Sequence, residues 1–406
     1  MKLKGKTMKI LVISQRYYPD QFRINEITVD LVKQGHEVMV ITGLPQDDEG
    51  YVRKDYRWGK NRREEWNGVQ IHRTYLTSRR KDILSLMINY VSFALSATLK
   101  ILRLSKKIDQ IVVFQVSPIT QIIPAVVMKK RAKIPLVVYI QDLWPMSVTT
   151  VGVKTDSFFY KLLRKFCTYL YSQADKLAIT SRSYEKILTN ELHVKVKCIY
   201  LPQFAEDIFT QNLQKRTNGK FNVLFAGSIG AAQSVETIVL AANELRENKE
   251  ILFWIVGGGR KYDDVVKLAK ELKLDNVNFT GHLPIEEMPY YHELADLFVV
   301  TLADNPLINI TLPAKVQTYM ACGKPIVAAA YGEVSTLFDN AKCGKYVKPS
   351  DYVGLSKLIK EYYEGPEKVG LYGNSGLQYY ISNFTKNKFY LILNGILQKN
   401  RSNLTK

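Results

Sequence analysis

Short runs of aliphatic and β-branched residues alternate with stretches of helical spacing along almost the whole chain. The runs have the length of strands, and their continuous apolar character is typical of strands covered on both faces. The alternation therefore predicts parallel sheets with helices on both sides. The clearest runs are KILVIS (9–14), HEVMVIT (36–42), IVVFQ (111–115), LVVYI (136–140), FNVLFAG (221–227), ILFWIVGGG (251–259), LFVVTL (297–302) and PIVAA (325–329).

The same rhythm occurs twice, and 406 residues exceed the size of one average domain. We expect a first domain over residues 1–205, a second over 206–385, and a helix in 386–406 that crosses back to the first. The predicted fold class is α/β, with two doubly wound Rossmann-like domains that face a cleft. Two independent binding domains in tandem remain the alternative.

The two halves differ in charge. Residues 1–205 carry 34 Lys and Arg against 17 Asp and Glu, whereas residues 206–406 carry 23 against 21. A basic module attracts nucleic acid, anionic lipid headgroups or phosphorylated substrates. Nucleic acid is not expected as a partner, because no recognition motif accompanies the charge.

Two features indicate the compartment. The four cysteines lack CxxC spacing, which predicts reduced thiols in a cytoplasmic protein. The apolar run near the first residue, 10–13, is too short for the core of a signal peptide.

A helix expected over residues 82–107 contains 17 residues without charge, Ile83 to Leu99, after the basic triplet Arg79-Arg80-Lys81. Such a helix could belong to the core, span a membrane at the lower limit of length, or lie on a membrane surface. A second apolar stripe with lysines and arginines, SFFYKLLRKFCTYLY, occupies 157–171. Together with the basic first half, these segments favour docking on an anionic membrane surface.

Glycine-rich or basic segments end the strands of the second half. They are FAGSIG (225–230), GGGR (257–260), GHLP (281–284) and TLPAK (311–315). Glycines allow a ligand to approach the backbone. A helix start beside Lys315 offers both N–H groups and a cation to an anion. The sequence therefore predicts a site for a nucleotide diphosphate.

These stretches carry a family resemblance. The chain resembles the retaining, family 4 glycosyltransferases of the GT-B fold, and within them the branch that builds bacterial capsule and O-antigen repeats on a lipid carrier, including fucosaminyltransferases. The matching stretches are MKILVISQRYYPDQFRINEI, LVKQGHEVMVITGLP, VVYIQDLWPMSV, VLFAGSIGAAQS, IVGGGR, VNFTGHLPIEEMPYYHELADLFV and TLPAKVQTYMACGKPIVAAAYGE.

The resemblance implies transfer of a sugar, an N-acetylamino sugar such as FucNAc, from a UDP-sugar to an acceptor of the undecaprenyl-pyrophosphate type. No DxD motif stands at a plausible strand end, so we expect no essential metal, and the nucleotide sugar is a substrate with no further cofactor expected. The resemblance also implies a cytoplasmic protein, peripheral on the inner face of a bacterial cell membrane.

Site residues follow by position. The predicted catalytic residues are Asp142, Lys315 and Arg260. The predicted donor-binding residues are Gly227, Ser228, Gly230, Gln233, Gly257, Gly258, Gly281, His282, Leu283, Asn305, Asn309, Pro313, Ala314, Thr318 and Glu333. The predicted acceptor-binding residues are Tyr17, Tyr18, Arg23, Asn25 and Trp144.

The chain departs from the wider family at four positions. Ser228 and Gln233 stand where the family has Arg and Lys, and Ile310 and Thr318 stand where it has two Glu. These departures leave open a non-catalytic, glycosyltransferase-like partner subunit. A sugar-nucleotide epimerase of the same architecture is a further alternative. A hydride-transfer enzyme is disfavoured, because GGG lacks the GxGxxG order.

Overall fold

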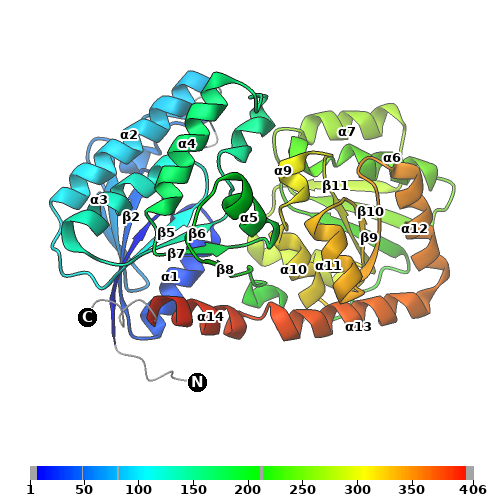
Figure 1. Ribbon diagram of the computed structural model, residues 1–406. Coiled ribbons are helices and arrows are strands. Elements are labelled where there is room, and N and C mark those ends of the chain that lie inside the picture. The colour runs from blue at the N-terminus through cyan, green and yellow to red at the C-terminus, as the bar shows by residue number, and fades with distance from the viewer. Residues whose placement is uncertain (1–6, 48, 80–81, 211–213, 399–406) are drawn as a thin grey trace. The chain divides into compact units, whose positions relative to one another are not determined.

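The computed structural model describes residues 7–47, 49–79, 82–210 and 214–398 (Figure 1). The chain divides into two compact units. Unit 1 takes its described residues from Met1–Thr180, Tyr184–Tyr200 and Leu393–Lys406, and unit 2 from Ser181–Ser183 and Leu201–Ile392. Arg80 and Lys81, two of the three basic residues expected to precede the long apolar helix, lie outside the described residues.

Unit 1 is built on an eight-stranded sheet of order β3-β4-β2-β1-β5-β6-β7-β8. Neighbouring strands are parallel except for β3 and β4, which pair antiparallel. The central strands are continuous apolar runs because helices cover both of their faces. The strands are β1 (Lys9–Ile13), β2 (Glu37–Gly43), β3 (Arg63–Trp66), β4 (Val69–Thr74), β5 (Gln110–Gln115), β6 (Leu136–Ile140), β7 (Lys176–Ile179) and β8 (Cys198–Tyr200).

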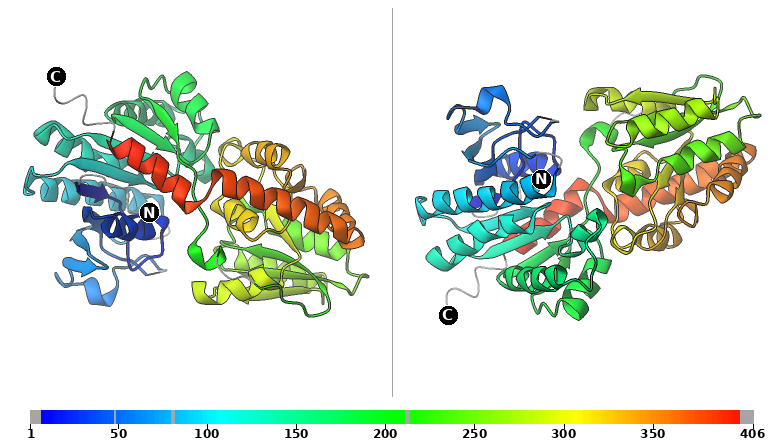
Figure 2. Two further views of the ribbon diagram at one scale, coloured as in Figure 1. Left: turned by 90° about the horizontal axis from the view of Figure 1, so that it is seen from below. Right: turned by 90° about the horizontal axis from the view of Figure 1, so that it is seen from above.

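Helices α2, α3 and α4 lie on one side of this sheet and α1 on the other, as Figures 1 and 2 show. Helix α2 packs against α3, β2 and β4, and α3 packs against β5, β6 and α4. The helices are α1 (Arg23–Lys33), α2 (Ile83–Leu102), α3 (Ile122–Ala132), α4 (Phe158–Ser172) and α5 (Ser183–Lys186).

Helix α2 is shorter than the sequence predicts. Asp82 caps its start, where the carboxylate accepts a hydrogen bond of 2.7 Å from the backbone N–H of Ser85. The helix ends at Leu102 and not at Lys107. Its buried face includes Phe93, Ala97 and Ile101. The next position in this series is the polar Ser105, so the apolar face does not continue beyond Ile101. The prediction of a helix that reaches residue 107 is wrong.

One face of α2 packs on the protein and the opposite face is apolar and exposed. Ile83, Leu84, Leu95 and Leu99 are each more than half exposed. By length and composition, α2 is the single helix in the described chain that could cross a membrane, a criterion that core helices of soluble proteins also meet. Helix α2 therefore packs on unit 1 with one face and exposes the other face.

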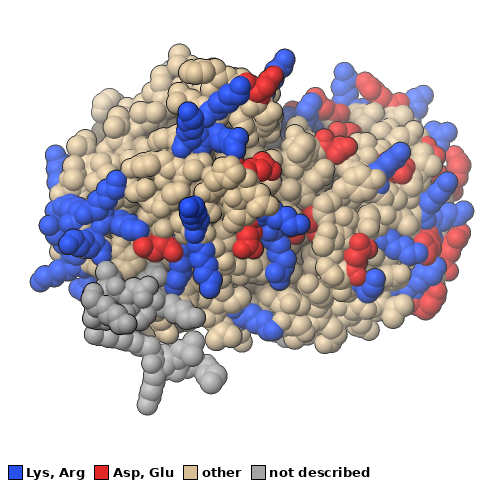
Figure 3. Space-filling model, viewed as in Figure 1, with Lys and Arg blue, Asp and Glu red and all other residues tan. Residues whose placement is uncertain are grey.

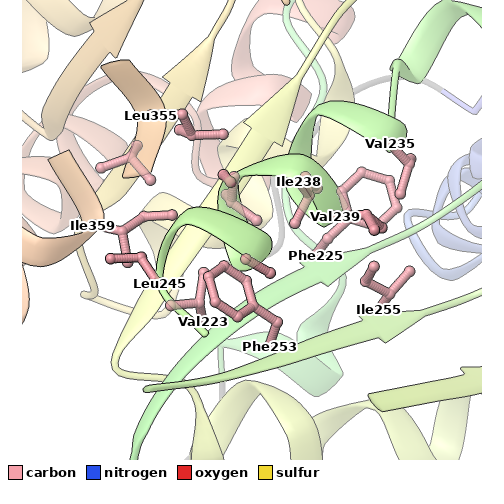
Figure 4. Close-up of a cluster of buried hydrophobic side chains, with 14 of the residues drawn as sticks. Val223, Phe225, Val235, Ile238, Val239, Leu245, Phe253, Ile255, Leu355 and Ile359 are labelled. Carbon is pink, nitrogen blue, oxygen red and sulfur yellow. The ribbon is translucent and has the colours of Figure 1, made fainter. Parts of the chain in front are cut away.

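Unit 2 is built on a six-stranded, parallel sheet of order β11-β10-β9-β12-β13-β14. Figure 4 shows the core between this sheet and its helices, where Val223, Phe225 and Phe253 meet Ile238 and Leu355. The strands are β9 (Phe221–Ala226), β10 (Ile251–Val256), β11 (Val277–Gly281), β12 (Leu297–Thr301), β13 (Ile326–Ala329) and β14 (Gly344–Val347).

Helices cover both faces of the unit 2 sheet. Helices α6, α7 and α12 form one layer, and α10, α11 and α13 form the other. Helix α14 (Lys386–Gln398) belongs to unit 2 up to Ile392 and to unit 1 from Leu393. The other helices are α6 (Glu236–Glu244), α7 (Tyr262–Glu271), α8 (Met288–Leu294), α9 (Pro306–Asn309), α10 (Ala314–Ala321), α11 (Glu333–Ala341), α12 (Tyr352–Glu364) and α13 (Pro366–Asn383). The prediction of two α/β domains on parallel sheets is confirmed.

Candidate functional site

The loops after β9 and β10 press together, backbone to backbone. The N–H of Gly227 donates to the carbonyl of Val256 at 2.9 Å, and the N–H of Ile229 donates to the carbonyl of Gly258 at 2.9 Å. A Cβ atom at Gly257 would lie 2.0 Å from the carbonyl oxygen of Gly227. Only glycine allows this approach, so the glycines predicted as a ligand cradle also hold the two loops together.

This approach gives a testable consequence for stability. Gly257→Ala should lower the free energy of unfolding by about 3 kcal/mol, because the new Cβ meets a carbonyl and the residue has a φ of 131°. The matched control is Gly219→Ala, where φ is 77° but no atom lies within 4 Å of the new Cβ. The control should cost about 1 kcal/mol. Equal losses in urea unfolding of the two variants would contradict the close contact.

Lys315 points its amine at these loops from the first turn of α10. Its Nζ lies 3.8 Å from the centroid of the Phe225 ring, and a Cβ at Gly227 would stand 2.8 Å from it. The amine is buried and has no hydrogen-bond partner among the described residues. Burial lowers its pKa from 10.5 to about 7. A buried, unpaired amine is costly, and an anion at the glycine loop would compensate it.

Tyr319 fixes the helix that carries Lys315. It lies four residues after Lys315 and therefore on the same face of α10. Its hydroxyl accepts a hydrogen bond from the N–H of Ala226 at 2.8 Å and lies 3.1 Å from the carbonyl of the same residue. Its ring stacks on Phe298 with centroids 4.0 Å apart. Tyr319 thus sets the position of the lysine relative to β9, a role that the sequence analysis missed.

One of the two polar side chains predicted to bind the donor near Gly227 already forms a hydrogen bond within the protein. The side-chain oxygen of Gln233 accepts a hydrogen bond from the N–H of Gly230 at 3.2 Å, and the Gln233 carbonyl accepts one from Thr301 at 2.6 Å. Ser228 is exposed, and no side-chain hydrogen bond is formed by it within the described part of the chain. Gln233 therefore shapes the loop, whereas Ser228 stands at its rim.

Strand β11 brings its end to the same edge. The N–H of Gly257 donates to the carbonyl of Gly281 at 2.9 Å, and a Cβ at Gly258 would lie 3.7 Å from the Cβ of His282. Leu283 follows, half-buried. Arg260 is exposed, and its guanidinium forms no ion pair with any described residue. The structure therefore places Arg260 in the same loop as the glycines but shows no contact between it and Lys315.

The segment before α10 supplies amide and hydroxyl groups. Asn305 caps α9 by accepting a hydrogen bond of 2.9 Å from the N–H of Leu307. Asn309 donates to Asp304 at 3.2 Å, and its buried side-chain oxygen has no partner in the described ranges. A Cβ at Gly332 would lie 1.9 Å from the Asn309 carbonyl oxygen, so the loop before α11 presses on this segment.

Four further donor candidates surround α10 and α11. Pro313 is the N-cap of α10, and Ala314 begins the helix. The Thr318 hydroxyl lies 3.5 Å from the carbonyl of Ala314, which is a weak contact. Glu333 begins α11, and its carboxylate accepts a hydrogen bond from the N–H of Ser183. Glu333 therefore already has a protein partner.

Asp142 lies in unit 1, just after β6. Its Oδ2 accepts hydrogen bonds from the N–H of Ser117 at 2.8 Å and from the Ser117 hydroxyl at 2.9 Å. Its Oδ1 forms no hydrogen bond with the described residues. Burial raises the pKa of the carboxyl group, and the bonds from Ser117 oppose that rise. One oxygen of the carboxylate is thus held in place by Ser117, and a role of the other in catalysis remains a prediction.

Trp144 belongs to the same network. Its indole N–H donates to the Ser117 hydroxyl at 3.2 Å, and its backbone N–H donates to the hydroxyl of Tyr171 at 3.1 Å. The side chain is buried. Trp144 therefore orients the serine that holds Asp142. The sequence analysis missed Ser117, because a Ser-Pro pair after a strand gives no sign of a partner 25 residues away.

The other acceptor candidates have partners inside unit 1. The Tyr17 hydroxyl lies 2.6 Å from that of Thr28, and burial raises the Tyr17 pKa to about 12. Arg23 forms an ion pair of 3.0 Å with Glu26. The Asn25 amide donates to the carbonyl of Asp20 at 2.7 Å. Tyr18 stacks on Trp66 with ring centroids 4.5 Å apart. These contacts stabilise the loop after β1, and binding of an acceptor by these residues remains a prediction.

Two family models match the chain, one for each half. Residues 21–202 match the glycosyl transferase 4-like domain, and residues 207–376 match the glycosyl transferases group 1.

Two curated bacterial proteins are similar to this chain. The "Probable glycosyltransferase WbjE" of Pseudomonas aeruginosa is 29% identical over 238 residues, which cover 55% of this chain and 59% of that protein. The "Putative colanic acid biosynthesis glycosyl transferase WcaI" of Escherichia coli (strain K12) is 25% identical over 353 residues, which cover 81% of this chain and 86% of that protein.

Solved structures share the fold. Sucrose-phosphate synthase from Thermosynechococcus elongatus superimposes with a TM-score of 0.76 at 15% identity, over 97% of this chain and 99% of that one. Anabaena Alr3699/HepE, solved in complex with UDP and glucose, gives a TM-score of 0.69 at 16% identity, over 97% and 100%. The chain is a glycosyltransferase of the GT-B fold, with a glycosyl transferase 4-like domain in its first half and a glycosyl transferases group 1 domain in its second.

Proposed function

We propose that the protein is a retaining glycosyltransferase that transfers a sugar from a UDP-sugar to a lipid-pyrophosphate-linked acceptor in bacterial capsule or O-antigen synthesis. The observation that carries the proposal is the buried amine of Lys315, without a partner in the described chain, beneath the glycine loop of β9. This arrangement fits a diphosphate, whose charge would pair with the amine. The UDP complex of HepE supports a uridine nucleotide as the donor.

The two units would supply different parts of the reaction. In unit 2, Lys315 in its protonated form would stabilise the charge that develops on the departing diphosphate. In unit 1, the free oxygen of Asp142 would accept a hydrogen bond from the attacking hydroxyl and orient it. We propose an N-acetylamino sugar such as FucNAc as the transferred group, by resemblance to the polysaccharide branch, and a reaction that needs no metal.

We further propose that unit 1 docks on the inner face of the cell membrane. Helix α4 lies on the same side of the sheet as α2 and exposes Phe158, Phe159 and Leu162. Lys161 and Lys165 stand exposed on the same helix. Figure 3 shows basic side chains on unit 1 with few acidic ones beside them, whereas unit 2 mixes both signs. Apolar side chains flanked by lysines suit the boundary between anionic headgroups and acyl chains.

The docking surface can be tested with vesicles. The double variant Leu84→Glu, Leu95→Glu should bind vesicles of anionic phosphatidylglycerol about tenfold more weakly, because it replaces two exposed leucines of α2 by charges. Leu371→Glu changes an equally exposed leucine of α13 in unit 2 and should leave sedimentation with vesicles unchanged. Equal vesicle binding by all three proteins would contradict docking through α2.

The proposed reaction is tested by supplying UDP-N-acetylamino sugars and a bacterial lipid extract in the presence of a chelator. Transfer of the sugar to the lipid fraction with retained anomeric configuration supports the proposal. Conversion of the donor sugar without transfer would indicate the epimerase. Absence of both turnover and nucleotide binding would favour the non-catalytic partner subunit.

A further inference from the structure

A small pocket in unit 1 lies at the carboxyl ends of β1, β2 and β5. Its lining includes Gln15, Arg16, Gly43, Arg79 and Ser117. The cavity measures about 20 Å³, which is the room of a water molecule. A larger group would therefore fit only in part, beside the lining residues Arg16 and Arg79.

The mouth has an excess of positive charge. Arg16 forms an ion pair of 3.0 Å with Asp20, and Arg53 pairs with the same carboxylate at 2.8 Å. The guanidinium of Arg79 has no hydrogen bond or ion pair with the residues that the structure describes. Arg16 and Arg53 thus share one carboxylate, and Arg79 adds an unpaired positive charge to the pocket lining, which favours an anion there.

The pocket also offers a buried acceptor atom. Gln15 is 5% exposed, and its amide nitrogen donates to Asn89 at 2.8 Å. Its side-chain oxygen is buried and has no hydrogen-bond partner among the described atoms. A buried polar atom without a partner costs free energy, and a hydroxyl or water bound in the pocket would satisfy it.

The pocket adjoins the carboxylate of Asp142. Ser117 lines the pocket and donates both of its hydrogen bonds to Asp142. The hydroxyl of Tyr90, on α2, interacts electrostatically with the same groups. Burial raises the pKa of Tyr90, the charges of Arg79 and Arg16 lower it, and the charge of Asp142 raises it. An anion between the arginines would therefore lie close to the carboxylate proposed to orient the acceptor hydroxyl.

We propose that Arg16 and Arg79 bind a phosphate or diphosphate group of the acceptor, with the side-chain oxygen of Gln15 accepting a hydrogen bond from an adjoining hydroxyl or from a bound water. This inference rests on the proposed function and assigns the acceptor's charged group to residues other than Arg23, which pairs with Glu26. Guanidinium groups match phosphate oxygens in geometry and charge.

Inorganic pyrophosphate is the probe for this site, and saturating UDP keeps it out of the site at Lys315. In calorimetry under these conditions, the wild type should bind pyrophosphate, and Arg16→Gln and Arg79→Gln should each bind about tenfold more weakly. Both variants should fold, because Asp20 keeps its ion pair with Arg53 and the Arg79 side chain forms no hydrogen bond or ion pair with the described residues. Lys60→Gln removes an exposed charge outside the pocket and should bind as the wild type does.

The outcomes distinguish failure of the proposed function from failure of the pyrophosphate site at Arg16 and Arg79. Failure of UDP itself to bind would count against the proposed function. Binding of UDP without any pyrophosphate site, or with a site that both arginine variants retain, would overturn the present inference. Competition by phosphatidylglycerol vesicles for the pyrophosphate site would also overturn it, because the pocket would then bind bilayer headgroups and not the acceptor.

Discussion

Lys315→Met should raise the melting temperature of the nucleotide-free protein by several degrees and weaken UDP binding about a hundredfold. Methionine fills a similar volume and packs well on the Phe225 ring, so the change removes an unpaired buried amine without leaving a cavity. The loss of affinity follows because the amine is the buried cation expected to pair with the diphosphate. A gain in stability with a loss of binding is typical of a group retained for function.

The pH dependence of this effect has a definite sign. Burial lowers the folded-state pKa of Lys315 to about 7, whereas the unfolded chain has the ordinary value of 10.5. Between these values the unfolded state binds the proton that the folded state lacks, so this group makes stability rise with pH. Below about 7 both states are protonated, and the cost of the buried charge is fully present. The melting-temperature advantage of Lys315→Met should therefore be largest near pH 6 and shrink toward pH 10.

Lys324→Met is the matched control. Lys324 is also a largely buried lysine of unit 2, with a pKa lowered to about 8 by burial, but its amine donates to the carbonyls of His292 and Glu293 at 2.6 and 2.7 Å. Its replacement should lower the melting temperature and leave UDP affinity unchanged. If Lys315→Met instead destabilised the free protein and bound UDP normally, Lys315 would be a structural residue.

Asp142→Asn should lower kcat by a factor on the order of a hundred or more while leaving the affinity for the donor unchanged. The amide keeps the shape of the carboxylate, and its oxygen can still accept the hydrogen bonds from Ser117. It lacks the charge that would orient and polarise the acceptor hydroxyl. Initial rates at saturating donor, together with donor binding by calorimetry, measure both quantities.

The raised pKa of Asp142 sets the direction of the pH profile of activity. Because burial raises the pKa of Asp142, the ionised form is lost at a higher pH than for an ordinary carboxyl group. Activity should fall on the acidic side through that raised pKa, and the acidic limb should be absent from the residual activity of Asp142→Asn. Asp156→Asn, an exposed carboxylate before α4, should have the wild-type profile. An unchanged kcat for Asp142→Asn would show that the carboxylate only holds its loop.

The fold was predictable because the central strands of both sheets are buried on both faces and so leave continuous apolar runs, such as ILVI in β1 and LVVYI in β6. Lys315 was predictable because Pro313 marks the start of its helix. That its amine has no hydrogen-bond partner among the described residues was not predictable, because this depends on packing against Phe225 and Gly227, which are far away in the sequence.

The residues that the sequence analysis missed act through distant contacts. Tyr319 reaches Ala226 across 93 positions, and Ser117 reaches Asp142 across 25. Arg16 and Arg79 line one pocket because β1 and β4 both border β2 in the sheet, although one arginine follows β1 and the other follows β4. Sequence spacing cannot reveal such pairs, because strand order is set by packing of the whole sheet.

Calorimetric titration of UDP at pH 8 with a chelator, in HEPES and in Tris, for the wild type and Lys315→Met tests whether the donor diphosphate binds at Lys315. A neutral amine that becomes charged beside the diphosphate predicts metal-free binding by the wild type, with uptake of about one proton. The variant should bind far more weakly and take up none. Absence of UDP binding by the wild type, or equal affinity and proton uptake in both proteins, would contradict the placement of the donor at Lys315.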